Sequence, residues 1–333
     1  MKKRLILLLW LLVMVGSVTA RNVTFISTSD CHYREPEHKL GHHNDLNRAS
    51  IEEMNRISTV TWPDKLGGGL IAPPRGVVVL GDLIDDGDLK TSATQYQLFV
   101  ADFGLDGTDG LLKYPAFEGW GNHDGPPEGK EKSGFSSQAQ LKKRNLIRKQ
   151  KGLISHLSDN GLHYSWDWDD VHFVQLNLYP ADKQNPNVKY SPVWHDPQGS
   201  LSFLKRDLAE KVGTSGRPVV LLSHCGFDTD WWIKEDWKAA YDAAKDYNVI
   251  LYIYGHTGTG LRQWAPEGET KKWDCINDGH TDIGFFVIQI TDDQLRAAYR
   301  CKNLKETKGE DKKIKRIWDG TWSWKFLLEK KLK

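Results

Sequence analysis

The segment GVVVLGDLIDDG, residues 76–87, decides the architecture expected of this 333-residue chain. Its first half is a continuous apolar run, and the sequence turns polar at Gly81-Asp82. A short run of branched apolar residues without polar alternation is typical of a strand that is buried on both faces. The segment therefore predicts an inner strand of a sheet covered by helices, with a carboxylate directly after its carboxyl end.

The same pattern recurs four times along the chain. Each apolar run is followed by polar residues: Val23–Ser29 by Asp30, Tyr114–Trp120 by Gly121-Asn122-His123-Asp124, Val219–Ser223 by His224, and Val249–Tyr254 by Gly255-His256. Stretches with apolar residues at helical spacing lie among them, at Asp45–Ile57, Gly199–Val212 and Trp237–Asp246. This alternation of strand and helix predicts an α/β fold.

Antiparallel strands are expected to extend this core. Two hairpins are predicted, Leu162–Trp168 with Val171–Leu178 and Gly284–Ile290 with Gln294–Tyr299. The charged stretch Lys302–Lys315 is predicted to be a loop, and the evenly spaced tryptophans of Arg316–Leu328 predict a final strand. Because no stretch rich in Pro, Gly or Ser divides the chain, we expect a single domain over residues 21–333, with a C-terminal strand extension.

The first 20 residues are typical of a secretory signal peptide. A basic start precedes the apolar run Leu5–Val15, and Val18-Thr19-Ala20 predicts cleavage before Arg21. An uncleaved anchor is less favoured, because the run is shorter than the roughly 20 residues of a membrane span. We therefore expect a secreted or periplasmic protein with no membrane span after cleavage. Export would allow pairing of Cys31 with Cys225 or of Cys275 with Cys301, against the alternative of buried thiols.

The overall charge excludes one class of partner. The chain has 45 Lys and Arg against 44 Asp and Glu, and the leader removes three of the basic residues. A mature chain so close to neutral does not have the strongly basic surface of a protein that binds nucleic-acid polymers. The less usual number is the 14 tryptophans, most of which are expected to serve packing.

The polar residues at the five strand ends predict one shared site. Carboxyl ends of strands in open α/β sheets are where ligands bind. The side chains delivered there are carboxylates, imidazoles and an amide, which are ligands for Mn, Fe or Zn. They are Asp30, His32, Asp82, Asn122, His123, His224 and His256.

These blocks resemble the five signature motifs of the calcineurin-like metallophosphoesterases, within the wider superfamily of purple acid phosphatases and phosphodiesterases. The matching segments occur in order over residues 30–256: DCH at 30–32, GDLIDDG at 81–87, GNHD at 121–124, SH at 223–224 and GH at 255–256. The resemblance implies a four-layer α/β/β/α sandwich with a dinuclear metal site that hydrolyses phosphate esters with a metal-activated water.

The resemblance also implies a role for each matching residue. Asp82 would bridge both ions, Asp30 and His32 would bind the first, and Asn122, His224 and His256 the second. His123 would act at the leaving oxygen as a general acid or charge stabiliser, with its ring oriented by Asp124. The implied substrate is a small phosphorylated molecule, preferably a phosphomonoester. The alternatives are a phosphodiesterase acting on nucleotides or lipid head groups, and a non-catalytic phosphate-ligand binding protein.

One position departs from the family pattern. The fifth motif usually reads Gly-His-x-His, with the second histidine on the first metal, whereas this chain has Gly258 there. Three outcomes are open: water fills the position, another histidine substitutes, or the first ion binds weakly. The candidate substitutes are His42, His43, His195 and His280.

Three of those histidines, together with one tryptophan, are also candidates for substrate contact: His42, His43, His195 and Trp194. Trp231-Trp232 would extend the same wall. The basic segment Lys130–Lys151 follows the third motif and would either steer an anionic substrate or form a solvated helix face.

Overall fold

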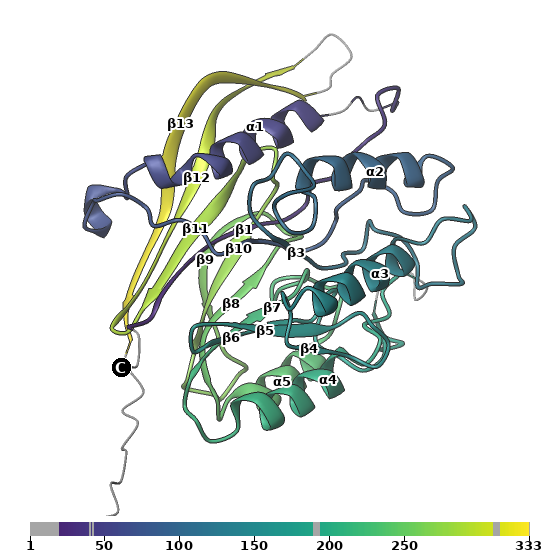
Figure 1. The fold of residues 1–333 in the computed structure, drawn as a ribbon. Helices are drawn as coiled ribbons and strands as arrows, with labels where there is room; N and C mark the ends of the chain where they lie inside the picture. Colours follow the sequence, from purple (N-terminus) through teal and green to yellow (C-terminus); the bar gives the residue numbers. More distant parts are fainter. Residues whose placement is uncertain (1–19, 40, 42, 189–193, 309–313, 333) are drawn as a thin grey trace, which may run out of the picture.

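The computed structural model describes residues 20–39, 41, 43–188, 194–308 and 314–332 (Figure 1). A six-stranded sheet has the order β13-β12-β11-β1-β2-β3, and a seven-stranded sheet has the order β4-β5-β6-β7-β8-β10-β9. The first sheet contains β1 (Asn22–Thr28), β2 (Val77–Val79), β3 (Ala116–Glu118), β11 (Gly284–Thr291), β12 (Gln294–Lys308) and β13 (Ile314–Lys331). The second contains β4 (His156–Leu157), β5 (Tyr164–Trp168), β6 (Val171–Gln175), β7 (Pro218–Leu222), β8 (Asn248–Tyr254), β9 (Thr259–Trp264) and β10 (Trp273–Asp278).

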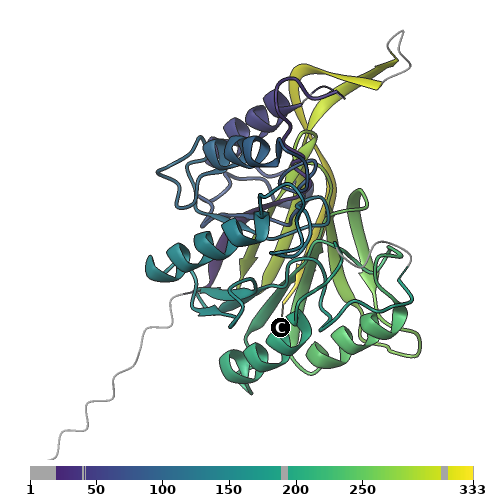
Figure 2. The same cartoon turned by 90° about the vertical axis from the view of Figure 1, so that its right-hand side faces the viewer.

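Helices cover the outer faces of both sheets, so the molecule has the predicted four layers (Figures 1 and 2). The helices are α1 (Asn44–Asn55), α2 (Ser92–Phe103), α3 (Ser137–Gln150), α4 (Ser200–Asp207) and α5 (Lys234–Ala244). A π-helical turn, Leu208–Val212, continues α4. Strand β2 illustrates the layering, because Val78 packs between the sheets whereas Val77 and Val79 pack in the outer core with residues of α1 and α2. This is the double burial that its continuous apolar run predicts.

Parallel pairing places the predicted strand ends together. Strands β1, β2 and β3 are parallel neighbours in the first sheet, as are β6, β7 and β8 in the second. Their carboxyl ends therefore lie at one edge of the sandwich. All five predicted inner strands are present, and so are the three predicted helices, with boundaries that differ by a few residues.

Several elements differ from the prediction. Helix α2 was not predicted, because it buries the polar residues Ser92, Gln95 and Asp102 and so lacks a clean apolar face. The predicted loop Lys302–Lys315 is wrong over its described residues, because β12 continues to Lys308 and pairs with β13 from Ile314 onward; residues 309–313 lie outside the described part of the chain. The two strands form a ribbon that extends beyond the rest of the sheet (Figure 2).

The cysteines do not form the disulfides that export would allow. All four cysteines lie within the described residues, and each is buried as a free thiol. Cys31 contacts the Thr281 hydroxyl at 3.2 Å, and Cys301 contacts the Ser323 hydroxyl at 3.4 Å. The alternative of buried thiols therefore describes this structure.

Candidate metal centre

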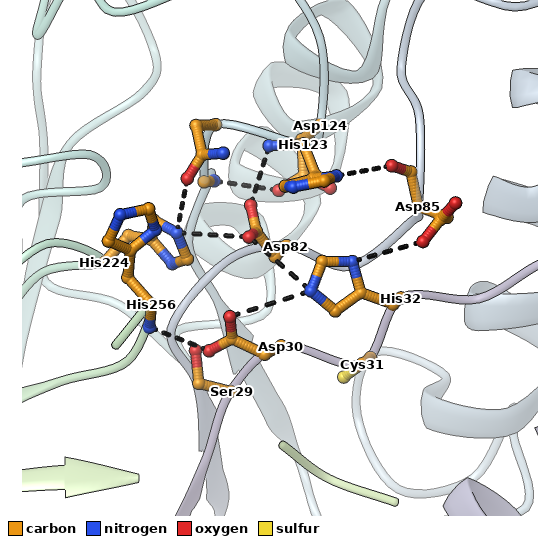
Figure 3. A network of polar contacts seen from close by, with 12 residues as sticks. Ser29, Asp30, Cys31, His32, Asp82, Asp85, His123, Asp124, His224 and His256 are labelled. Atoms are coloured by element: carbon orange, nitrogen blue, oxygen red, sulfur yellow. Dashed lines mark hydrogen bonds and ion pairs between the residues drawn. The ribbon is translucent and has the colours of Figure 1, made fainter. Parts of the chain in front are cut away.

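The loops that follow the strands bring the predicted ligands together at one edge of the two sheets (Figure 3). Asp30 and His32 follow β1, Asp82 follows β2, and Asn122 and His123 follow β3. The second sheet contributes His224 after β7 and His256 after β8. All of these side chains are at least partly buried except that of His123, which is exposed.

Four of these residues have a strained backbone. Asp30, His32, Asp82 and His256 have φ angles of 51°, 43°, 50° and 70°, in the left-handed region that side chains other than glycine seldom occupy. Such conformations cost about 1 kcal/mol or more each and cluster at functional sites. The strain indicates that these turns serve to aim the side chains.

Two glycines in the motifs allow the loops to approach each other. A Cβ atom on Gly255 would lie 2.6 Å from Oδ2 of Asp30, and one on Gly121 would overlap the Asp82 carboxylate. Any larger residue would push these carboxylates aside. The glycines before Asn122 and His256 are therefore required by the packing of the site itself.

Polar groups surround the two best-buried imidazoles of the site. Nδ1 of His224 lies 2.9 Å from the carbonyl oxygen of Leu80, so it is the nitrogen that donates. Nε2 of His224 then faces Oδ1 of Asn122 at 2.9 Å and Oδ2 of Asp82 at 3.3 Å. In His32, Nε2 faces Asp30 and Asp82 at 3.7 and 3.8 Å, while Nδ1 faces Asp85 at 3.6 Å. The carbonyl behind His224 is the kind of partner that orients a metal-binding imidazole, whereas Nδ1 of His32 makes no hydrogen bond to the described residues.

The charges of the site favour cations. Burial alone would raise the pKa of Asp82, but His224 and His123 outweigh burial and hold it well below its usual value. Burial lowers the pKa of His224, whereas Asp82 raises it, and the result is a pKa of about 9. Burial and then His224 lower the pKa of His256 to about 4. The Asp82 carboxylate therefore stays ionised, and the proton on His224 compensates part of its charge, as expected of a buried site without another cation.

The donor atoms fit metal ions. Four groups of side chains each place their ligand atoms within 4.8 Å of one another: Asp30–His32–His280, Asp30–Asp82–His224, His32–Asp82–His123, and His224–Cys225–His256. Asp30, His32, Asp82 and His224 each belong to two groups, so the groups describe adjoining positions rather than separate sites. Carboxylate and imidazole donors suit Mn, Fe or Zn.

The catalytic pair predicted from the third motif has a different geometry. Nδ1 of His123 lies 2.5 Å from the backbone carbonyl oxygen of Asp85, not beside Asp124. The Asp124 carboxylate accepts from the amides of Leu83 and Gly121, both at 2.8 Å. The expectation that Asp124 orients the His123 ring is therefore corrected: Asp124 ties the loop after β2 to the loop after β3. Burial, and then Asp82, raise its pKa to about 7.

A pocket of about 520 Å³ adjoins the cluster. Its lining includes two of the predicted substrate contacts, Trp194 and His195, together with Trp231. The ring of Trp231 lies 4.0 Å from that of His195 and 4.8 Å from that of His256, measured between centroids. The pocket thus has an aromatic wall next to the candidate metal ligands.

Other candidates for substrate contact lie elsewhere. His43 packs behind the site, with Nε2 3.3 Å from the carbonyl oxygen of Cys31, and His42 lies outside the described residues. Trp232 is buried in the core, where its indole donates to the carbonyl of Gly226 at 2.7 Å. The wall is therefore formed by Trp231 and not by its neighbour.

The prediction missed polar residues around this pocket. Asp85 faces His32 and His38 and pairs with Arg34 at 2.7 Å. The available signal was its place three residues after Asp82 in the same loop. His280, which was one of four possible substitutes, lies with Asp30 and His32, and the centroids of the two imidazole rings are 5.3 Å apart.

The basic segment after the third motif forms α3 and partly faces inward. Arg144 and Arg148 are buried and pair with Glu118 at the end of β3. These two residues neutralise an internal carboxylate, so neither a solvated face nor substrate steering describes them.

The family model described as calcineurin-like phosphoesterase matches residues 23–259. The chain is also similar to solved structures of TT1561 from Thermus thermophilus and of the calcineurin-like phosphoesterase YfkN from Bacillus subtilis. The first has 11% identity over 82% of this chain and 94% of that chain, with a TM-score of 0.40. The second has 13% identity over 94% and 91%, with a TM-score of 0.39.

A third similar structure is the 5'-nucleotidase from Candida albicans SC5314, with 12% identity over 81% of this chain and 47% of that chain and a TM-score of 0.36. No curated protein matches the sequence. Within the part of the chain that the structure describes, no helix has the length and apolar character needed to cross a membrane.

Proposed function

The chain belongs to the calcineurin-like phosphoesterase family, and on this premise we propose that it is a metal-dependent hydrolase of phosphate esters that prefers phosphomonoesters. One observation carries the proposal: the buried carboxylate of Asp82 lies where two groups of candidate ligands adjoin, and the cluster opens into a pocket. Ions bound by residues of both sheets would lie beside this pocket, which would take the phosphate ester.

Each side of the cluster would hold one ion. Asp30, His32 and Asp82 would contribute to the first, and Asp82, Asn122, His224 and His256 to the second. When bound, such ions neutralise charge on phosphate oxygens and lower the pKa of water to near neutrality. Asn122 lies in the loop after β3, and its side-chain oxygen faces Nε2 of His224, so both atoms are placed to bind the second ion.

His123 is placed to serve the leaving group. Its backbone amide donates to Asp82 at 2.8 Å, and its Nδ1 contacts the Asp85 carbonyl. These contacts fix the ring and reserve Nε2 as the nitrogen that donates a proton to the leaving oxygen. As the ester bond breaks, that proton neutralises the departing alkoxide, which is general acid catalysis.

The organic part of the substrate would lie in the pocket beside His123. Trp194 and Trp231 offer aromatic faces there, and Asp85 and Asp86 offer carboxylates that accept hydrogen bonds from hydroxyl groups. Apolar walls with a few polar groups are typical of pockets for small molecules.

The proposal is tested by assaying the purified chain with nitrophenyl monoesters and diesters in the presence of Mn, Zn or Fe. We expect metal-dependent hydrolysis, faster for the monoester, and its loss on chelation. Replacing His123→Asn should slow the hydrolysis of alkyl phosphates more than that of nitrophenyl phosphate, because the poorer leaving group needs the proton. Absence of turnover with every metal would overturn the proposal.

A second candidate, a non-catalytic binder of phosphate ligands, is favoured by the missing histidine at position 258. That position is Gly258, which has no side chain to bind the first ion. Phosphate binding without turnover, in a chain that holds a single ion, would support this function instead.

We also propose that the chain is exported and cleaved before Arg21. Its backbone nitrogen lies 3.1 Å from the Asp292 carboxylate, and its guanidinium pairs with Asp170 at 2.6 Å. Cleavage at this bond would convert that nitrogen into an ammonium group beside a carboxylate. Mass spectrometry of the exported chain should find Arg21 as the first residue, and retention of residues 1–20 would contradict this.

A further inference from the structure

We propose that His280 completes the first metal position, in place of the histidine that Gly258 lacks. The inference rests on the proposed metal-dependent function and assigns one further ligand to it. His280 follows strand β10, whereas the family motif places its histidine at position 258, after strand β8.

The side chains already converge. The ligand atoms of Asp30, His32 and His280 all lie within 4.8 Å of one another. The imidazoles of His32 and His280 are nearly parallel, with an angle of 27° between their planes. Two imidazoles and a carboxylate so placed form a common half of a metal coordination sphere.

Strand pairing explains how His280 replaces position 258. Strands β9 and β10 are antiparallel, with Thr259 opposite Asp278, so Gly258 lies across from Gly279. A Cβ atom on Gly279 would be 2.9 Å from the Gly258 carbonyl oxygen. The residue after Gly279 therefore reaches the same corner of the site that a side chain at position 258 would serve.

The backbone around His280 is fixed to the loop that carries the other ligands. His280 forms an isolated parallel bridge with Ser29, the residue before Asp30. The amide and hydroxyl of Thr281 donate to the Ser29 carbonyl at 2.9 and 2.8 Å. The His280 carbonyl accepts from the amides of Ile283 and Gly284 at 3.0 and 3.2 Å. The imidazole is thus positioned by a rigid turn.

The ring of His280 is not explained by a structural role. Among the described residues, its nitrogens have no hydrogen-bond partner, although a buried carboxylate is near. A histidine that serves packing normally satisfies its ring nitrogens when it is partly buried. Ligand atoms that lie within 4.8 Å of one another, with no hydrogen bond from the His280 ring in the described part of the chain, form an arrangement that a cation would complete.

Metal counting tests the inference. Elemental analysis and titration with Mn²⁺ should find two ions in the wild-type chain and one tightly held ion in His280→Ala. The affinity of the weaker site should fall by about 100-fold or more, because even the partners of metal ligands contribute 10–100-fold. His43→Ala is the matched control, since that ring contacts a backbone carbonyl of the same loop, and it should keep two ions.

A second variant gives a spectroscopic readout. In His280→Cys loaded with Co²⁺, a thiolate at this position should produce a sulfur-to-cobalt charge-transfer band, because soft thiolates bind such ions directly. The wild-type chain and His43→Cys supply the baseline from the native cysteines. A purely structural role for residue 280 would not create this band.

The outcomes separate the two proposals. Two ions of unchanged affinity in His280→Ala, or no new band in His280→Cys, would overturn the assignment and leave the proposed function standing. A wild-type chain that hydrolyses esters with one bound ion would also overturn the assignment of His280 and leave the proposed function standing. A wild-type chain that binds no ion would overturn both.

Discussion

Two clusters rich in histidines and carboxylates lie at opposite ends of the parallel strands. The site cluster comprises Asp30, His32, Asp82, His224 and His256. The closed cluster comprises His156, Ser165, Asp167, His172, Asp207 and Arg217, near the amino-terminal ends of β6 and β7. The two sets use almost the same residue types, and they differ in how their atoms are satisfied.

Every imidazole of the closed cluster has a close carboxylate. Nδ1 and Nε2 of His172 lie 2.7 Å from Asp167 and Asp207 respectively, and Nδ1 of His156 lies 2.6 Å from Asp207. Ser165 adds a fourth contact, to Asp207 at 2.7 Å. Arg217 also pairs with Asp167, so the closed cluster has a cation of its own and needs no metal ion to balance its charge.

The site cluster is open by contrast. His32 stands 3.7 and 3.8 Å from its carboxylates, and His224 is 3.3 Å from Asp82. Its strained turns hold several acceptors around one point. Both clusters contain histidines and aspartates. The distance between imidazole and carboxylate, which is short in the closed cluster and longer in the site cluster, distinguishes the structural network from the candidate cation site.

The largest expected effect follows from removing the shared ligand. Asp82→Ala should lower kcat/KM by about 10³-fold or more, equivalent to roughly 4 kcal/mol of transition-state stabilisation. The metal-free variant should also unfold at a lower denaturant concentration, because Asp82 pairs with His224 at 3.3 Å and accepts from the His123 amide at 2.8 Å. Steady-state kinetics and urea unfolding measure these two effects. Retained activity would contradict the assignment of the site cluster as the metal centre.

The corresponding change in the closed cluster should lower stability without affecting activity. Asp207→Ala removes the acceptor of two histidines and a serine, and should reduce the free energy of unfolding by about 3 kcal/mol. Its metal content and its kcat/KM per folded molecule should match the wild type. A loss of bound ions in this variant would show that the two clusters are not independent.

Added metal ions should stabilise the folded chain only by binding to the site cluster. An ion that binds the folded chain at 100 times its Kd adds about 2.7 kcal/mol per site. Thermal unfolding with and without chelator should show this gain in the wild type and in Asp207→Ala. Most of it should be absent from Asp82→Ala, and an equal gain in all three chains would place the ions elsewhere.

The smallest effect concerns pH and the His172–Asp207 pair. Burial opposes the charge of His172, but Asp167 and Asp207 raise its pKa above 6.5, so its contribution is complete below about pH 6.5 and is lost as pH rises through the raised value. Burial likewise opposes ionisation of Asp207, but His172 lowers its pKa below 3.8, so its contribution is present above that pH and is lost in stronger acid.

His172→Gln should therefore reduce the free energy of unfolding by about 2 kcal/mol, most strongly between about pH 4 and 6.5, where both groups are charged. Denaturant unfolding of the chelated protein across this range measures the difference. A difference that does not change with pH would show that the pair is not ionic.

The sequence was informative where the signal is local. Apolar runs that end in polar residues are determined by the strands themselves, so Asp30, Asp82 and His224 were found with their neighbours. The position of His280 depends on the pairing of β9 with β10, and no residue near His280 in the sequence indicates that pairing. Likewise, Arg148 reads as part of a basic surface until the fold brings Glu118, 30 residues away, beside it.

The central claim is that the site cluster, and not the closed cluster, holds two metal ions. Anomalous diffraction from crystals grown with Mn²⁺ tests it most directly. The account predicts two adjacent peaks on either side of Asp82, one of them beside His280, and none at His172. An anomalous difference map without peaks at Asp82, or with a peak between His156 and Asp207, would contradict the claim.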